Sequence, residues 1–334
     1  MRNKARSIRL GVIAAASLML ALASPPAQAE KWDMAIVWPA GNFHTKNAMT
    51  FAQEVKKATE GEIEITVHAG GALGQKGPEL LKAVQQGIVP IAEFALVQQT
   101  GEEPLLGIEA QPFLINDYNQ LKELYQHARA PIDKVFAKRN QKILYLVPWP
   151  SQGIFTKIKV EKLADLKGLK IRTTNTTSSN LAKRLGMTPV QLPFGDVVPA
   201  LATGRLNAVG TGTSSAVDAK FWEFLKYMYR TNHFWASNVV SVNLDAFKKL
   251  KPVHQEAILA VAKRLEPEFW KISAEADVRN AETLTKNRLQ ILQPSAQLIS
   301  EMRKAATPMW GEYVKAVGEP AGSILKNYRS AVGK

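Results

Sequence analysis

The sequence predicts an α/β protein of two lobes, joined by crossing strands and braced by one long helix. Three observations support this prediction. Short apolar stretches alternate with helix-periodic stretches of roughly ten to fifteen residues, which is typical of βαβ units and a mainly parallel sheet. The chain of 334 residues is long enough for two domains. The final third is almost wholly helical in pattern.

The first 29 residues are expected to be an export signal and not part of the fold. Arg2, Lys4, Arg6 and Arg9 form a basic segment before an apolar run from residue 10 to 23. That run is shorter than the ~20 residues of a membrane-spanning helix. A small-x-small site at Ala27–Ala29 then predicts cleavage before residue 30, and a periplasmic location, although an uncleaved anchor is the alternative.

Composition narrows the possible functions. The chain has no cysteine, which excludes disulfides, thiol nucleophiles and thiolate metal sites. The formal net charge is +14, and four of these charges lie in the signal. The remaining basic residues are spread over helices without forming a block, so we expect no nucleic-acid partner. The basic composition is better explained by a general positive electrostatic field that favours the binding of small anions.

The first half of the mature chain is expected to contain four strands and three helices. Glu93 interrupts the third strand, and its carboxylate either lies at the mouth of a pocket or is paired with another side chain inside the protein. The strands are expected at Asp33–Trp38, Ile63–His68, Val89–Leu96 and Lys142–Trp149, and the helices at Lys46–Thr59, Pro78–Gln86 and Asn119–Asn140.

The second half begins with Asp165–Asn175, in which Lys167 and Gly168 form a turn before a short buried strand that ends at Arg172. Further strands are expected at Thr188–Leu192, Asn207–Gly210 and Val239–Asn243, and helices at Ser178–Leu185, Asp196–Thr203, Trp222–Tyr229, Pro252–Arg264, Pro267–Asn287 and Ser295–Lys334. The helix from Pro267 would be roughly 30 Å long and could brace two lobes.

No catalytic, metal or cofactor motif stands out. The loop Gly70–Gly77 lacks both the phosphate-loop ending and the dinucleotide fingerprint. The five histidines show no metal-ligand spacing, and no serine-hydrolase elbow is present. We therefore expect no cofactor, no metal and no enzymatic activity.

The remaining candidates are aromatic and neutral polar residues at predicted strand ends, which together describe an apolar cleft with a few polar anchors. Arg172 lies where α/β proteins bind ligands, and its guanidinium matches a carboxylate in two parallel hydrogen bonds. From the spacing alone, Arg172 is more readily interpreted as an ordinary surface arginine than as a ligand-binding one. The candidates are Trp38, Asn42, Phe43, Glu93, Trp149, Gln152, Phe155, Arg172, Asn175, Thr211, Trp235 and Asn238.

Five segments resemble the solute-binding subunit of tripartite ATP-independent periplasmic (TRAP) transporters, the DctP-like family. They are Trp38–Thr45, Gly61–Ile65, Gly71–Gly74, Asp165–Arg172 and Ala200–Gly204. The resemblance covers nearly the whole mature chain and implies the two-lobe periplasmic binding protein fold. It also implies that Arg172 pairs with the carboxylate of an organic acid, and that membrane permease subunits are the partners of a monomeric protein.

The sequence departs from the family pattern at two positions. The family asparagine that assists the carboxylate falls on Thr211, so its contact could pass to a hydroxyl or to Asn238. A second arginine found in sialic-acid-type members is replaced by Gln152. The resemblance therefore implies a monocarboxylate, aromatic or a hydroxy or keto acid.

The resemblance places residues 30–149 and 238–277 in a first lobe, and 150–237 and 278–334 in a second. Two alternatives remain open. One is a periplasmic α/β enzyme acting on a small carboxylate, with Glu93 and His44 as an acid/base pair. The other is a binding protein that serves a sensor kinase or an ATP-driven importer.

Overall fold

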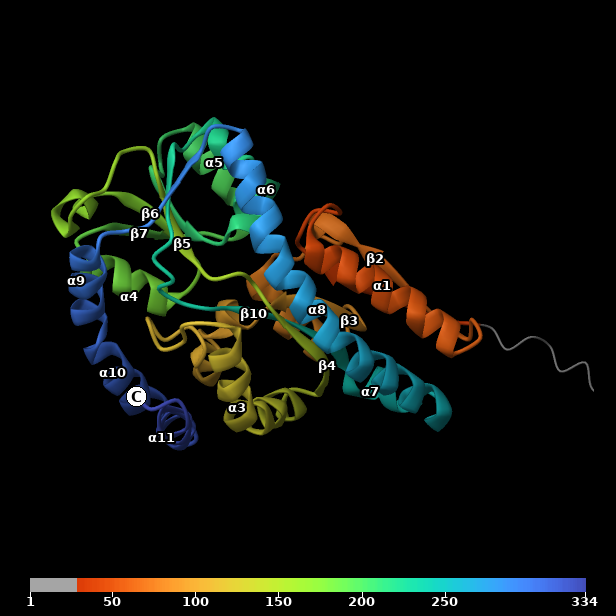
Figure 1. Ribbon diagram of the computed structural model, residues 1–334. Helices are drawn as coiled ribbons and strands as arrows, with labels where there is room; N and C mark the ends of the chain where they lie inside the picture. The colour runs from red at the N-terminus through yellow and green to blue at the C-terminus, as the bar shows by residue number, and fades with distance from the viewer. Residues whose placement is uncertain (1–28) are drawn as a thin grey trace, which may run out of the picture.

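The computed structural model describes residues 29–334, so the expected export signal lies almost entirely outside the described residues. The protein has two β-sheets surrounded by helices, which confirms the predicted α/β class (Figure 1). None of the helices in the described part of the chain is both long and apolar enough to cross a membrane.

The first sheet has five strands in the order β2-β1-β3-β10-β4. Strand β10 comes from late in the chain and pairs antiparallel with both β3 and β4, whereas β1 pairs parallel with β2 and β3. Its strands are β1 (Glu30–Ile36), β2 (Ile63–His68), β3 (Ile91–Ala95), β4 (Gln141–Pro148) and β10 (Ser237–Asn243), and its helices are α1 (Phe43–Ala58), α2 (Leu80–Gln85), α3 (Tyr118–Lys138) and α7 (Leu244–Lys249).

The second sheet has six strands in the order β11-β9-β5-β8-β6-β7. Its strands are β5 (Gly153–Thr156), β6 (Lys170–Thr173), β7 (Thr188–Gln191), β8 (Ala208–Thr211), β9 (Tyr227–Tyr229) and β11 (Gln290–Leu292), and the shorter helices beside it are α4 (Thr176–Arg184), α5 (Val197–Ala202) and α6 (Thr213–Asp218). Strand β5 runs antiparallel to β8 and β9. Apart from β10 in the first sheet and β5 in the second, the strands of each sheet run in one direction, so the expectation of mainly parallel sheets is confirmed.

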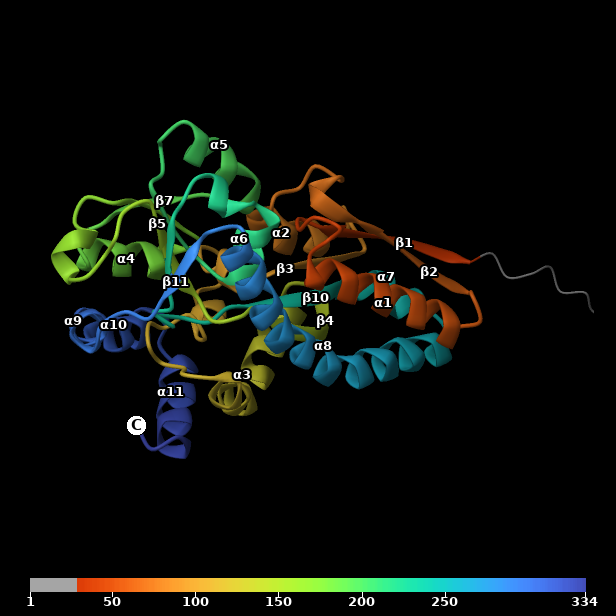
Figure 2. The same ribbon diagram turned by 45° about the horizontal axis from the view of Figure 1, so that its top comes forward.

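Helix α8 (Pro252–Lys286) is one continuous helix of 35 residues. The sequence predicted two helices separated before Pro267, and that prediction was wrong, because packing on both sides of the proline maintains the helix. At 1.5 Å per residue it is about 50 Å long. Leu265 and Phe269 are buried in the core of the first sheet and Leu284 in that of the second, so α8 braces both (Figures 1 and 2).

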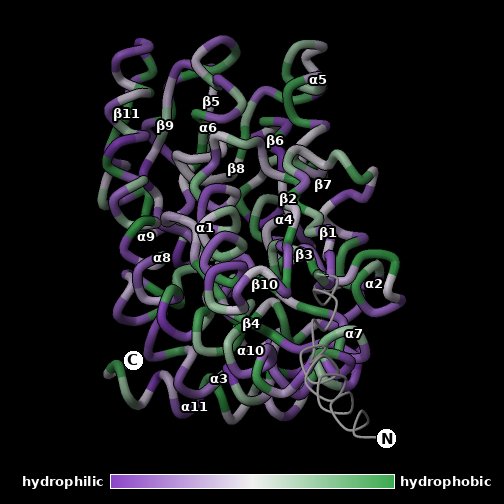
Figure 3. Tube along the Cα trace, turned by 90° about the vertical axis from the view of Figure 1, so that its right-hand side faces the viewer, coloured by the Kyte–Doolittle hydropathy of each residue, from purple (hydrophilic) through white to green (hydrophobic). Residues whose placement is uncertain are grey.

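Each sheet is covered by hydrophobic residues on both faces. Adjacent residues of one strand belong to different cores: Met34 and Ala35 of β1 lie on opposite faces, as do Ala208 and Val209 of β8. Figure 3 shows hydrophobic (green) and hydrophilic (purple) stretches mixed along the trace. This two-sided burial holds the strand ends, and the side chains that follow them, in fixed positions.

The C-terminal segment forms helices α9 (Ala296–Ala306), α10 (Pro308–Val317) and α11 (Ala321–Ala331). Leu298 and Met302 of α9 join a core of the second sheet, whereas Leu325 and Tyr328 of α11 join a core of the first and pack near α3. The lobe boundaries stay a proposal, and this packing favours placing α11 with the first lobe instead of the second.

Candidate functional site

Arg172 is held at the end of a central strand of the second sheet. Gly168 makes the preceding turn with φ of 77°, and β6 then pairs with β7 and β8 on its two sides. The arginine side chain is 3% exposed, and its Nε donates a hydrogen bond to the carbonyl of Leu192 at 3.0 Å. Burial lowers the pKa of Arg172 to about 10, so it remains a cation at neutral pH.

The guanidinium has no carboxylate partner among residues 29–334, and the Leu192 bond is the hydrogen bond found for it there. A buried cation without a counter-ion is costly. Its Nη groups border a cavity, so the charge is directed at the space that a ligand would fill.

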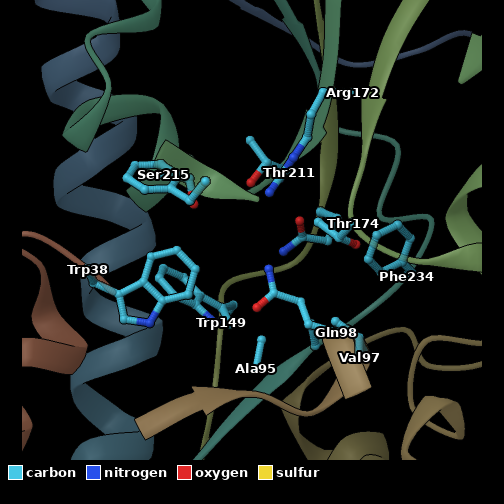
Figure 4. A pocket seen from close by; sticks show the side chains of 13 residues that line it. Trp38, Ala95, Val97, Gln98, Trp149, Arg172, Thr174, Thr211, Ser215 and Phe234 are labelled. Carbon is cyan, nitrogen blue, oxygen red and sulfur yellow. The ribbon is translucent and has the colours of Figure 1, made fainter. Parts of the chain in front are cut away.

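The cavity lies between the two sheets and encloses about 30 Å³ (Figure 4). It is much smaller than the 300–1,000 Å³ of sites for drug-sized ligands. A ligand could therefore enter only if the sheets move apart, and the sheets would then close around it less tightly than they do here. The lining residues are Trp38, Ala95, Val97, Gln98, Trp149, Gln152, Arg172, Thr174, Phe194, Thr211, Ser215, Phe234 and Ala236.

Aromatic rings form one wall of this cavity. The ring centroids of Trp38 and Trp149 are 4.6 Å apart in an edge-on arrangement, and Phe194 lies 5.3 Å from Trp38. Figure 4 shows the two tryptophans on one side and Arg172 entering from another. Such rings would bury the apolar body of a ligand, while the arginine would meet its charge.

Several polar atoms at the cavity lack partners in the described part of the protein. Trp38 Nε1, Gln98 Oε1 and Thr174 Oγ1 are buried and make no hydrogen bond there. Leaving a buried polar group unpaired costs about 1–3 kcal/mol. Three such atoms around one cavity indicate that a ligand or ordered water completes their bonding.

A second layer of polar residues lies behind Trp149. The Trp149 indole donates to Asn238 Oδ1 at 2.6 Å, Asn238 donates to Glu93 Oε1 at 2.8 Å, and His44 Nδ1 lies 2.9 Å from the same oxygen. Glu93 is thus paired internally, one of the two interpretations that the sequence left open. Because Glu93, Asn238 and His44 do not line the cavity, the acid/base pair of the enzyme alternative has no contact with it.

Asn42 and Phe43 also belong to this supporting layer. The Asn42 side chain accepts a hydrogen bond from the His44 amide at the start of α1 and donates to Asp218 Oδ2 at 2.5 Å. Phe43 packs edge-on against Trp149, with ring centroids 5.4 Å apart. Both residues hold the aromatic wall in place without lining the cavity.

Three further candidates lie away from the cavity. Phe155 is fully buried against Phe221 in a core of the second sheet. Trp235 is in a core of the first sheet and donates to the Ile115 carbonyl. Asn175 caps α4 by accepting a hydrogen bond from the Ser178 amide. Asn175 follows the end of β6 as expected, whereas Phe155 lies within β5 and Trp235 lies in the stretch before β10. The direction of each side chain depends on packing.

Of the sequence candidates, the cavity brings together Trp38, Trp149, Gln152, Arg172 and Thr211. Sequence reasoning missed several lining residues, namely Gln98, Thr174, Phe194, Ser215 and Phe234. Thr174 and Ser215 lie in donor-rich stretches after strands, which could have identified them. The described residues contain no cluster of three or more acidic or histidine side chains arranged to hold a metal ion.

Comparison with known proteins identifies the family. The profile of the bacterial extracellular solute-binding protein family 7, DctP, matches residues 34–316. The chain belongs to this family. Its members are solute-binding proteins, which agrees with the resemblance found in the sequence and with the predicted two-lobe fold.

Three relatives illustrate the likeness to this family. DctP7 of Bordetella pertussis, a receptor that binds pyroglutamic acid, is 32% identical over 90% of this chain and 100% of its own, with a TM-score of 0.88. A marine metagenome TRAP solute-binding protein specific for pyroglutamate is 33% identical over 91% of this chain and 99% of its own, with a TM-score of 0.87. The ectoine/5-hydroxyectoine-binding protein UehA of Ruegeria pomeroyi is 24% identical over 96% of this chain and 95% of its own.

Proposed function

We propose that this protein captures a small organic acid with a single carboxylate outside the cytoplasm and delivers it to the membrane subunits of a TRAP transporter. The observation that carries the proposal is the buried Arg172 guanidinium, which faces a cavity walled by aromatic rings. In this proposal the N-terminal 29 residues direct export and are removed, and the mature protein acts as a monomer.

The ligand that fits best is pyroglutamate, a five-membered lactam with one carboxylate. Three solved relatives above 30% identity bind it, and each aligns over at least 90% of this chain. The cavity offers one cation and an aromatic wall, which favours a monocarboxylate with an apolar ring over an acidic sugar with many hydroxyl groups. The carboxylate would meet Arg172, and the ring would lie against Trp38 and Trp149.

Binding free energies indicate how much of the affinity could come from Arg172 and how much from the aromatic rings. A charge-assisted hydrogen bond contributes about 1.5–3 kcal/mol, whereas a micromolar complex needs about 8 kcal/mol. The arginine alone therefore cannot account for such an affinity. Burial of the ring against the tryptophans and closure of the two sheets around the ligand would supply the remainder.

Isothermal titration calorimetry with a panel of small acids tests this proposal. We expect pyroglutamate to bind wild type, and Arg172→Ala to weaken binding by at least a hundredfold because the carboxylate would lose its paired donors. Arg172→Lys keeps the charge but loses the planar fork, so we expect an intermediate affinity.

Arg205 is exposed, and Arg205→Ala is the matched control, which should bind as wild type does. The proposal would be wrong if Arg172→Ala bound the best acid as tightly as wild type. It would also be wrong if no monocarboxylate of the panel bound the wild-type protein.

A further inference from the structure

Gln98 lies at the opposite side of the cavity from Arg172. It belongs to the short 3₁₀ helix Leu96–Gln99, which follows β3 of the first sheet, whereas Arg172 comes from the second sheet. Figure 4 shows the Gln98 amide reaching from the neighbourhood of Ala95 and Val97 into the space below Arg172. The cavity thus has a charged end and a neutral amide end, supplied by different sheets.

Gly77 makes the room for this side chain. A Cβ added at Gly77 would lie 2.2 Å from Gln98 Oε1 and 3.1 Å from its Cδ. The backbone of Gly77 is not in the left-handed region, so the need for glycine here is one of space. Gln99 Nε2 donates to the Gly77 carbonyl at 2.9 Å, and this hydrogen bond holds the segment around Gly77 beside the 3₁₀ helix of Gln98.

The Gln98 amide is not used by the protein itself. Its Oε1 is buried without a partner, and neither of its polar atoms makes a hydrogen bond within residues 29–334. The Oε1 atom of this amide rests against Gly77, and the Nε2 atom faces the cavity. A carboxamide can donate a hydrogen bond to a ligand carbonyl or accept one from a ligand N–H.

From this geometry we infer that Gln98 selects acids that carry a ring amide, and that Gly77 is required because it leaves the Gln98 carboxamide its place. The inference rests on the proposed function, since Arg172 must hold the carboxylate for the ring to face Gln98. A lactam ring presents both an N–H and a carbonyl, so it pairs with Gln98 in either orientation of the amide. A hydrocarbon ring would leave the Gln98 amide buried and unpaired.

The test compares three acids with the same carboxylate on a five-membered ring: L-pyroglutamate, its lactone analogue (5-oxotetrahydrofuran-2-carboxylate) and cyclopentanecarboxylate. Calorimetry gives their dissociation constants for wild type, Gln98→Met and Gly77→Ala. Methionine keeps the length of glutamine without its hydrogen-bonding groups. The alanine Cβ displaces only the end of the flexible Gln98 side chain, so both variants should fold.

For wild type we expect pyroglutamate to bind at least about tenfold more tightly than cyclopentanecarboxylate, as one or two buried hydrogen bonds would give. In Gln98→Met this ratio should fall to about one, while the affinity for cyclopentanecarboxylate changes by less than about threefold. Gly77→Ala should lower the ratio in the same direction. Gln126→Met, at an exposed glutamine of α3, is the matched control and should keep the wild-type ratio.

The inference would be overturned if Gln98→Met kept the full preference for pyroglutamate, or if wild type bound pyroglutamate and cyclopentanecarboxylate equally. In both cases the acids still bind, so the proposed function stands. If none of the three acids bound wild type, the proposed ligand class would fail, and the assignment of Gln98 would fail with it. The lactone separates the two hydrogen bonds, because it retains the carbonyl but has no N–H.

Discussion

The contact between Asn42 and Asp218 predicts that ligand binding depends on pH. Asn42 begins α1 beside the first sheet, and Asp218 ends α6 beside the second, so their hydrogen bond joins the two halves of the protein. Burial raises the pKa of Asp218 to about 6, although its bond to Asn42 and the charge of Lys46 act in the opposite direction. Separation of the sheets would return this carboxyl to solvent and to its usual pKa near 3.9.

The direction of the pH dependence follows from the difference in the pKa of Asp218 between the closed form, in which the sheets lie together as in this structure, and the open form, in which they are apart. Above pH 6 the closed form holds a charged, partly buried carboxylate, which disfavours closure; below pH 6 the carboxyl becomes protonated in the closed form first. Protonation therefore favours closure and ligand binding. With pKa values of about 6 closed and about 3.9 open, linkage predicts up to about tenfold tighter binding at pH 5 than at pH 7.5, and less if solvent screens the partly exposed group.

Asp218→Asn keeps an oxygen that accepts the Asn42 hydrogen bond but removes the titration. We expect this variant to bind pyroglutamate more tightly than wild type at pH 7.5, with little change between pH 7.5 and pH 5. Calorimetry at several pH values measures both effects, and Asp133→Asn, on the exposed side of α3, is the control. Parallel pH profiles for wild type and Asp218→Asn would refute the reasoning.

Two further predictions concern the support of the site and the core of the second sheet. Asn238→Leu would leave the Trp149 indole unpaired and would leave Glu93 with His44 as its remaining partner. We expect a loss of about 1–3 kcal/mol in stability and weaker ligand binding, measured by thermal unfolding and calorimetry. Unchanged values in both would contradict the supporting role. Gly153→Ala would place a Cβ 2.7 Å from a backbone carbonyl of β9, so we expect about 1–3 kcal/mol of destabilisation in chemical denaturation. Gly41→Ala is the control and should be neutral, because a Cβ at that position meets nothing within 4 Å. Equal stability of the two variants would contradict this packing argument.

Local patterns determined most strands and helices of this protein, but they missed β5 and β11 and predicted a helix at Trp222–Tyr229, where the structure has strand β9. The alternation in Ile63–His68 and the helical period in Lys46–Thr59 report which residues face a core, and that relation depends only on neighbours in the chain. The turn at Gly168 and the following strand likewise placed Arg172 at a strand end. Arg172 could be identified as a candidate because a strand end in an α/β protein is a position that the sequence itself reveals.

Only the tertiary structure decided which of the strand-end residues share a cavity. Asn175 and Trp235 follow the same local rules as Arg172 and Trp149, yet their side chains cap a helix and fill a core. Pro267 would end an isolated helix, but contacts on both sides keep α8 continuous. Gln98 faces Arg172 from another sheet, and Gly77 makes room for it from about twenty positions earlier in the chain. Such relations depend on contacts between distant segments, whereas a local pattern reports only the burial of each residue among its neighbours.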